Sequence, residues 1–302
     1  MRYISVTEAA KKWGLTDRTV RSYCSEGKVP GAFLTGKTWN IPADASSPGK
    51  KNAVKHSRSA LLSALKEEKE GRIKGRIYHK VQIKMTYNSN RIEGSELSED
   101  QTRLIFETNT VGMAEKDVNA DDIVETMNHF RCVDHMIDNA ETVLTEDLIK
   151  EFHFMLKNGT SDSRRTWFRV GEYKLMANEV GGEETCPPAH VRYKMKELLE
   201  DHNSKDPKTF DDILDLHQRF ERIHPFQDGN GRVGRLMMFK ECLANGIVPF
   251  VIDERHRSYY YRGLKEWNNE KGSLRDTCLS AQDEFRKWLT YFEISERDQR
   301  HS

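Results

Sequence analysis

The stretch that decides how this chain folds reads His224-Pro225-Phe226-Gln227-Asp228-Gly229-Asn230-Gly231-Arg232-Val233-Gly234-Arg235. Before it, apolar residues recur at near-helical spacing over 210–223, which predicts a helix that Pro225 stops at His224. After it, the apolar run 236–239 predicts a second helix, which Gly246 ends. The glycines between the two helices allow close backbone approach, and a loop of free amides leading into a helix N-terminus is typical of a phosphate site.

The charged residues of this stretch suit a bound polyanion. Arg232 and Arg235 lie three apart and project from one face of a helical turn, where two cations oppose the helix macrodipole. Asp228 offers a hard oxygen to a cation such as Mg²⁺, and His224 can take a proton from a Ser, Thr or Tyr hydroxyl near neutral pH. Taken singly, each residue has a plainer interpretation as a solvated helix end, a turn or surface charge. Only the combined spacing favours a functional site.

The run resembles the signature of the Fic family, HPFx(D/E)GNGRxxR, at every fixed position. Members move a nucleotidyl group, usually AMP from ATP, onto a hydroxyl of a protein. The resemblance therefore implies a mainly α protein with an all-helical Fic domain (115–294) that carries a small β-hairpin flap. It implies ATP as co-substrate, Mg²⁺ as cofactor, release of pyrophosphate, and a protein substrate, for which the chain itself is one candidate. The implied roles are the base His224, the metal ligand Asp228, the anion-holding amides of Gly229, Asn230 and Gly231, Arg232 at the leaving pyrophosphate and Arg235 at the γ-phosphate.

A second motif lies in the N-terminal helices expected over 57–114. Ser89-Asn90-Arg91-Ile92-Glu93-Gly94 is similar to the family's inhibitory pattern, (S/T)xxxE(G/N). This resemblance implies a short helix that brings Glu93 to Arg235, where a carboxylate uses the fork that the γ-phosphate of ATP would use. The alternative is an ordinary helix N-cap at Ser89 with an exposed Glu93. Residues 59–101 look helical and highly charged, and Glu67, Glu68 and Glu70 predict a solvated face.

Residues 169–183 lack helical period, contain a glycine pair and end before Pro187-Pro188, after which a helix is expected from Ala189 to about His202. This arrangement is similar to the Fic flap, whose backbone pairs with the target as an added strand. The resemblance implies that the flap residues near the nucleotide are Val180, Gly181, Gly182 and Glu183. An ordinary surface hairpin is the alternative.

Residues 257–268 resemble the segment that lines the adenine pocket in relatives. Aromatic faces suit a purine and an amide suits its edge, so the candidates are Tyr260, Tyr261 and Asn268. Adjacent tyrosines on a helix more often place one ring in the core and the other in solvent, and that alternative stays open.

The N-terminal residues differ in charge from the rest. Residues 1–56 hold ten Lys or Arg against four Asp or Glu, a net +6, so a chain of net charge zero carries −6 elsewhere. Ser5 and Glu8 form a capping-box pattern, Thr16 predicts a second helix cap, and residues 32–41 predict a hairpin turning near Gly36-Lys37. Helix, turn, helix and wing over 1–46 resemble a MerR-like or excisionase-type winged helix-turn-helix. The implied DNA contacts are Arg18, Arg21, Ser22 and Lys37.

Other functions stay open for both parts. The two helices expected within residues 1–46 could mediate protein contacts instead of binding DNA. A nucleotide-sensing regulator with little turnover, removal of AMP, or transfer of UMP or GMP are alternatives for the Fic domain. The intact glycines and both arginines favour a nucleoside triphosphate over phosphocholine. By the same resemblance, a homodimer is a further expectation.

The remaining features are plain. A Pro, Gly, Ser and Lys-rich segment predicts a linker over 47–56, and a charged tail follows at 295–302. Five scattered cysteines, the lack of an 18-residue apolar run and the lack of a signal peptide predict a cytoplasmic protein with reduced thiols and no membrane partner.

Overall fold

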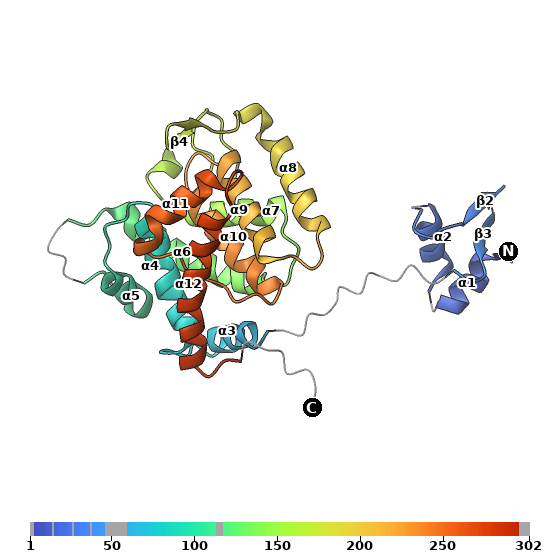
Figure 1. Cartoon of the computed structure of the whole chain (residues 1–302), viewed down its shortest axis with the longest axis horizontal. Helices are drawn as coiled ribbons and strands as arrows, with labels where there is room; N and C mark the ends of the chain where they lie inside the picture. Colours follow the sequence, from blue (N-terminus) through green and yellow to red (C-terminus); the bar gives the residue numbers. More distant parts are fainter. Residues whose placement is uncertain are drawn as a thin grey trace. The chain divides into compact units, whose positions relative to one another are not determined.

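The computed structural model describes residues 3–13, 15–25, 27–36, 38–45, 59–112 and 117–295, which fall into two compact units, Met1–His56 and Ser57–Ser302 (Figure 1). Several predictions lie outside the described residues. They are the wing residue Lys37, the linker at 47–56, the boundary between 114 and 115, and the tail beyond residue 295.

Capping residues set the helices of the smaller unit. The Ser5 amide donates to Glu8 Oε2 at 2.8 Å and the Glu8 amide donates to Ser5 Oγ at 3.2 Å, which starts α1 (Val6–Trp13) as predicted. Thr16 Oγ1 accepts from the Thr19 amide at 3.3 Å and caps α2 (Asp17–Ser25). The predicted hairpin forms as β2 (Phe33–Thr35) and β3 (Thr38–Pro42).

A third strand was not predicted. β1 (Tyr3–Ile4) pairs antiparallel with β3, so the sheet order is β1-β3-β2. Two residues give too short a signal for sequence periodicity. The small core of this unit is made of Val6, Ala9, Ala10, Val20, Cys24, Val29 and Ile41.

The larger unit is helical, with a single pair of short strands among its described residues (Figure 1). Its α-helices are α3 (Ala60–Glu70), α4 (Ile77–Ile92), α5 (Glu99–Thr108), α6 (Ala120–Asp138), α7 (Glu146–Lys157), α8 (Pro188–Ser204), α9 (Phe210–Ile223), α10 (Asn230–Ala244), α11 (Arg257–Glu266) and α12 (Gly272–Tyr291). Two 3₁₀ turns, η1 (Asp162–Arg164) and η2 (Glu254–His256), and the hairpin of β4 (Glu179–Val180) and β5 (Glu183–Glu184) complete it.

Helix α10 is the centre of this unit. Thirteen of its fifteen residues are buried, because α4, α6, α7 and α9 all pack against it. Gly234 lets α9 come close, since a Cβ there would lie 2.6 Å from the His217 ring. The helix that carries the two motif arginines is therefore held rigidly on several sides.

Two expectations about helices need correction. The region 59–101 is broken at 71–76, where Gly71 ends α3 and Arg72 takes a positive φ of 49°. Glu68 belongs to no solvated face, because it is 4% exposed and accepts from Arg76 Nε at 3.0 Å and the Tyr78 amide at 2.9 Å. The sequence alone does not distinguish a buried glutamate that accepts hydrogen bonds from a turn between helices from a glutamate on the surface.

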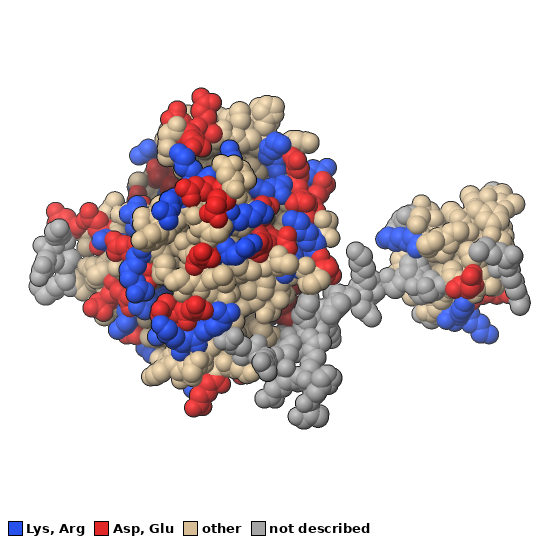
Figure 2. Space-filling model, viewed as in Figure 1, with Lys and Arg blue, Asp and Glu red and all other residues tan. Residues whose placement is uncertain are grey.

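The surface carries both signs of charge. Lys and Arg side chains are interspersed with Asp and Glu over the visible face of the larger unit (Figure 2). None of the helices formed by the described residues is long and apolar enough to cross a membrane.

Candidate functional site

The end of α9 positions His224. Thr209 and Asp212 form a capping box at the start of the helix, and the His224 amide closes its end by donating to Phe220 O at 2.8 Å. His224 itself has φ 50° and ψ 62°, a left-handed conformation usually taken by glycine. Strain of this kind in a residue of a candidate site indicates that the position serves more than the fold.

Asn230 fixes the loop that follows His224. Its Oδ1 accepts from the Phe226 amide at 2.9 Å and its Nδ2 donates to Phe226 O at 2.9 Å. Helix α10 already begins at Asn230, with Gly229 at φ 80° as its N-cap, so Gly231 and Asn230 lie in the first helical turn. The sequence predicted a longer loop, because glycine and asparagine are poor helix formers.

His224 is a neutral imidazole in this environment. Burial, helped by the charge of Lys174, lowers the pKa of His224 to about 4. Its Nδ1 lies 4.0 Å from Glu221 Oε2, and each of the two side chains is 16% exposed. Burial, reinforced by the charge of Glu93, raises the pKa of Glu221 to about 8. At neutral pH an unprotonated base therefore stands beside a protonated carboxyl.

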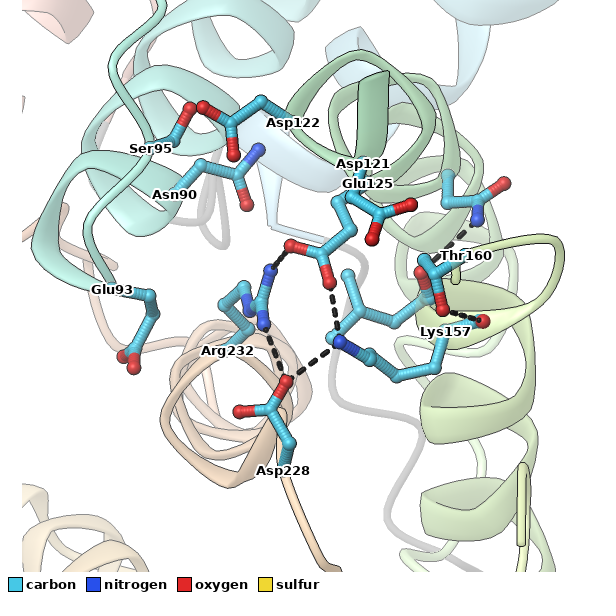
Figure 3. A network of polar contacts seen from close by, with 12 residues as sticks. Asn90, Glu93, Ser95, Asp121, Asp122, Glu125, Lys157, Thr160, Asp228 and Arg232 are labelled. Carbon is cyan, nitrogen blue, oxygen red and sulfur yellow. Dashed lines mark hydrogen bonds and ion pairs between the residues drawn. The ribbon is translucent and has the colours of Figure 1, made fainter. Parts of the chain in front are cut away.

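Four alternating charges form a closed ring of contacts around Arg232 (Figure 3). Lys157 Nζ lies 2.5 Å from Glu125 Oε1 and 2.6 Å from Asp228 Oδ2, while Arg232 binds Glu125 and lies 3.3 Å from Asp228. We call Glu125, Lys157, Asp228 and Arg232 the charged ring. Lys157 and Arg232 are 3% and 5% exposed, so each needs the carboxylates to remain charged in the interior.

The charged ring keeps Asp228 ionised. Burial opposes the charge, but Arg232 and Lys157 outweigh it and hold the pKa of Asp228 well below its usual range. The described residues contain no cluster of three or more His, Cys, Asp or Glu that could hold a metal ion by itself. A single ionised carboxylate still fits Mg²⁺, which commonly takes one or two protein carboxylates and obtains its other ligands from phosphates and water.

Arg235 is held by the motif at the end of α4. Its Nη2 donates to Glu93 Oε1 at 2.7 Å and to Ser89 O at 3.0 Å, and its Nε donates to Ser89 Oγ at 2.9 Å. Ser89 lies inside α4 and is 3% exposed, so it is no N-cap. A Cβ on Gly231 would collide with Glu93 Oε1, which gives the second motif glycine a use in this contact.

Little space is left beside this contact. The cavity next to Ser89 and Arg235 has a volume of about 10 Å³, roughly what one water molecule needs. Its walls are Met85, Ser89, Arg235, Met238, Phe250, Val251 and Ile252. This cavity is too small to hold a phosphate group.

The predicted flap residues form an exposed hairpin. Val180 pairs with Glu183 across Gly181 and Gly182, both of which have positive φ. Glu183 reaches α11, where its Oε1 lies 3.0 Å from Lys265 Nζ. The main chain before the hairpin lies against the motif, since the Lys174 amide donates to Pro225 O at 2.8 Å.

The three candidates for the adenine pocket differ in their exposure to solvent. Tyr260 is 1% exposed and belongs to the core, with its hydroxyl bonded to His217, so its face is closed to a purine in this structure. Tyr261 is 41% exposed, and Asn268 is exposed just beyond α11. The interpretation with one tyrosine in the core and its neighbour in solvent describes the pair.

The predicted DNA-contact residues Arg18, Arg21 and Ser22 are exposed on α2 of the smaller unit. They belong to the smaller unit, whereas the residues described above belong to the larger one.

Sequence patterns gave no indication of Glu125, Lys157, Lys174 and Glu221. Glu125 and Lys157 lie 107 and 71 residues from the ring members they bind, so no local spacing marks them. Glu221, three residues before His224, could have been found, because i and i+3 side chains share a helix face.

Comparison with known proteins finds a family match in this part of the chain. Residues 143–242 match the model of the Fic/DOC family. This chain carries a Fic domain. The family match covers α7 to most of α10, including His224, the glycines, both arginines and Lys157, and leaves Glu93 and Tyr260 outside it.

Distant relatives include the protein adenylyltransferases Fic of Drosophila mojavensis and Aedes aegypti. Each is 29% identical to this chain, over 234 and 235 residues, or 74% and 75% of its length. The matched region spans only 41% and 42% of those proteins. The activities of the whole relatives are therefore a guide to experiments on the Fic domain.

Solved structures share the helical Fic fold. A Fic-domain signaling protein from Bacteroides thetaiotaomicron superposes with a TM-score of 0.60 at 22% identity, covering 79% of this chain and 99% of that one. A Fic-1 fragment from C. elegans gives 0.58 at 18% identity, covering 77% of this chain and 72% of that one. The mainly helical fold expected from the motif is confirmed.

Proposed function

We propose that this chain is an autoinhibited Fic-type protein AMP-transferase that uses ATP and Mg²⁺ in the cytoplasm. The observation that carries the proposal is the contact of Glu93 with Arg235 at 2.7 Å beside a complete motif. The carboxylate oxygen accepts from a buried guanidinium nitrogen that a phosphate oxygen could use in its place. The distant relationship to protein adenylyltransferases supports the choice of reaction.

The chemistry follows from the protonation states of the site. The unprotonated His224 removes a proton from a Ser, Thr or Tyr hydroxyl, whose oxygen forms a bond to the α-phosphorus of ATP. The bond from that phosphorus to the α,β-bridging oxygen breaks, and pyrophosphate leaves with its electron pair. Amides at the start of α10 and Arg232 stabilise the charge that develops.

Asp228 and the phosphates would hold Mg²⁺, which neutralises phosphate charge when bound. Arg235 is the group that the γ-phosphate needs. With Glu93 in place, the guanidinium is already paired, so ATP lacks the contact that sets its productive pose.

The experiment is incubation of the protein with Mg²⁺ and ATP labelled on the α-phosphate, with and without EDTA. We expect label on the chain or on an added lysate protein, strongest in Glu93→Gly and lost in His224→Ala. Glu96→Gly is the matched control, because it adds the same backbone freedom three residues on, at an exposed side chain. Absence of label in every variant, with ATP bound, would contradict AMP transfer. Label from UTP or GTP only would indicate transfer of another nucleotide. Release of AMP from modified protein would indicate the reverse reaction, removal of AMP.

We also propose that the smaller unit binds DNA. Two capped helices and a hairpin form a compact unit in which Arg18 and Arg21 are exposed on α2. Cations on one helix are the electrostatic footprint expected of such a module. A nucleotide-sensing regulator would use this unit as its output, with the Fic domain as sensor.

A gel shift against genomic fragments over a salt series tests DNA binding. We expect affinity to fall as salt rises and to weaken in Arg18→Ala and Arg21→Ala. Lys196→Ala in the larger unit is the matched control, since it also removes an exposed cation. No shift even at low salt would refute DNA binding and leave AMP transfer untouched.

A further inference from the structure

Lys174 is a buried cation between the flap and the motif. Its side chain is nearly inaccessible, at 4% exposure for the residue, and its ammonium donates to Asn178 Oδ1 at 2.7 Å, Thr185 Oγ1 at 2.6 Å and Ile223 O at 3.4 Å. An ammonium has three donors, and these three acceptors use all of them. Each acceptor is neutral, so the charge itself is not paired with an acid in these contacts.

The acceptors tie two segments into one body. Asn178 and Thr185 flank the β4–β5 hairpin and hold its base together, because the Thr185 amide and hydroxyl both donate to Asn178 O, at 3.2 and 2.9 Å. Asn178 Nδ2 also donates to Phe226 O at 3.3 Å. Ile223 O, the third acceptor, belongs to the residue directly before His224. One ammonium therefore spans the flap base and the backbone that aims the imidazole.

A neutral side chain would serve the fold at lower cost. Burying a cation without a carboxylate is unfavourable, and the burial lowers the pKa of Lys174 to about 8, with Cys186 opposing the shift. Such a charge is best explained by a neighbour that requires it. Lys174 contacts the main chain on both sides of His224, at Ile223 O through its ammonium and at Pro225 O through its amide.

The charges around His224 show what that requirement is. Glu221 faces it from its own helix, Asp228 from the following loop, Glu93 from the end of α4, and Lys174 from the flap base. The charges of Asp228 and Glu93 and a backbone hydrogen bond of Glu221 favour the imidazolium, whereas the charge of Lys174 disfavours it. Lys174 is thus the cation that opposes protonation of the base among these four.

We propose that Lys174 is a positioning residue for His224, which fixes the flap base to the turn before the imidazole and keeps the imidazole unprotonated. This inference rests on the proposed AMP transfer for its purpose, though its electrostatic half concerns the resting protein alone. The ammonium acts through His224 and the flap, and it takes no part in bond formation.

The first test needs no activity. The pKa of His224 is measured by ¹⁵N NMR of the imidazole in the full chain and in Lys174→Met, Lys174→Arg and Thr185→Val, with His224→Ala to assign the signal. We expect the pKa to rise in Lys174→Met, which keeps the length and removes the charge. It should stay low in Lys174→Arg and Thr185→Val, which keep a cation. An unchanged pKa in a folded Lys174→Met would overturn the electrostatic half.

The second test measures labelling from ATP over pH in a Glu93→Gly background. Lys174→Met should lower the rate at neutral pH by roughly tenfold or more, since small displacements of a base are costly, and should move the acid limb to higher pH. Thr185→Val should lower the rate without moving that limb. Folding is checked by urea unfolding, and Lys174→Gln, which also removes the charge, replaces Lys174→Met if the latter is unfolded.

The two proposals fail differently. Full labelling at an unshifted acid limb in both variants would overturn the role of Lys174 and leave AMP transfer standing. No label in Glu93→Gly alone would refute AMP transfer, while the imidazole titration would still decide whether Lys174 holds His224 unprotonated.

Discussion

The two arginines of α10 lie three residues apart and are held in different ways. Arg232 belongs to the charged ring, where Lys157 binds the same two carboxylates from α7, and every member depends on the others. Among the described residues, Arg235 has a single carboxylate partner, Glu93, at the end of α4. The Glu93 side chain is 26% exposed, against 14% for Glu125.

This difference separates a permanent pair from a removable one. Withdrawing Glu125 would leave two buried cations short of an acid, whereas withdrawing Glu93 would leave one guanidinium free for an incoming phosphate. We infer that the contacts of Arg232 stabilise the site, and that the contact of Arg235 with Glu93 regulates it in the proposed reaction.

The rate of labelling from ATP should show the largest difference between the Arg232 side and the Arg235 side of the site. Glu93→Gln should raise labelling from ATP by about 10- to 100-fold, the range of typical coupling energies between sites. Glu125→Gln should lower it, because Arg232 and Asp228 lose their support. Labelling rates of the two variants, with Glu96→Gln as control, measure this. A change in the same direction for both would mean that the two sides are not distinct.

Stability should divide the same two variants. Glu125→Gln is expected to cost about 3 kcal/mol, because it leaves buried cations uncompensated. Glu93→Gln should cost less, because it leaves one buried cation short of an acid instead of two, and because Glu93 is the more exposed carboxylate. Urea unfolding at pH 7 gives both values. Equal losses would show that Glu93 is as structural as Glu125.

Lowering the pH should lower the free energy of unfolding by similar amounts through a histidine on the Arg232 side and one on the Arg235 side. Burial lowers the pKa of His153, near the charged ring, and of His217, near Arg235, to about 3, below the unfolded value near 6.5. The unfolded chain therefore takes up protons first as pH falls, and stability is lost between about pH 6.5 and 3. At pH 5 each histidine should account for up to about 2 kcal/mol. Urea unfolding of His153→Gln and His217→Gln at pH 7 and 5 tests whether the two losses match.

The smallest effect is expected at Ser89. Ser89→Ala removes the hydroxyl that accepts from Arg235 Nε but keeps the backbone contact. The loss of one such bond is worth about 1 kcal/mol, so labelling should rise by roughly fivefold. Ser95→Ala, which removes a hydroxyl not bonded to Arg235, serves as the control. A larger rise than in Glu93→Gln would assign the restraint to Ser89.

Local signals account for what the sequence could predict. The bounds of α9, the capping box at Ser5 and the hairpin turn after Thr35 all depend on residues within a few positions of each other. The helical Fic fold followed from one motif, because its spacing is specific. Interpreted as a phosphate loop, the same motif predicts that His224, Asp228 and Arg235 lie near one another.

Long-range pairs account for what it could not predict. Lys157 is the last residue of α7, where a basic residue ordinarily complements the helix dipole, so nothing marked it as a buried partner of Asp228. Lys174 bonds forward to Asn178, Thr185 and Ile223 from a stretch without periodicity. Tyr260 shows the reverse case. Its place in the sequence predicted an adenine-pocket residue, but its side chain lies in the core.

The end of α4 turns a reaction rate into a measure of local folding. Glu93 is the C-cap residue, its amide bonds back to Asn90 O at 3.1 Å, and Gly94 follows with φ 105°. Helix ends open far more readily than whole domains. In the proposed reaction, the resting rate divided by the uninhibited rate is the fraction of molecules in which this last turn is open. Each factor of ten in that ratio corresponds to about 1.4 kcal/mol, so two turnover measurements would report how firmly one helical turn is held, without denaturant.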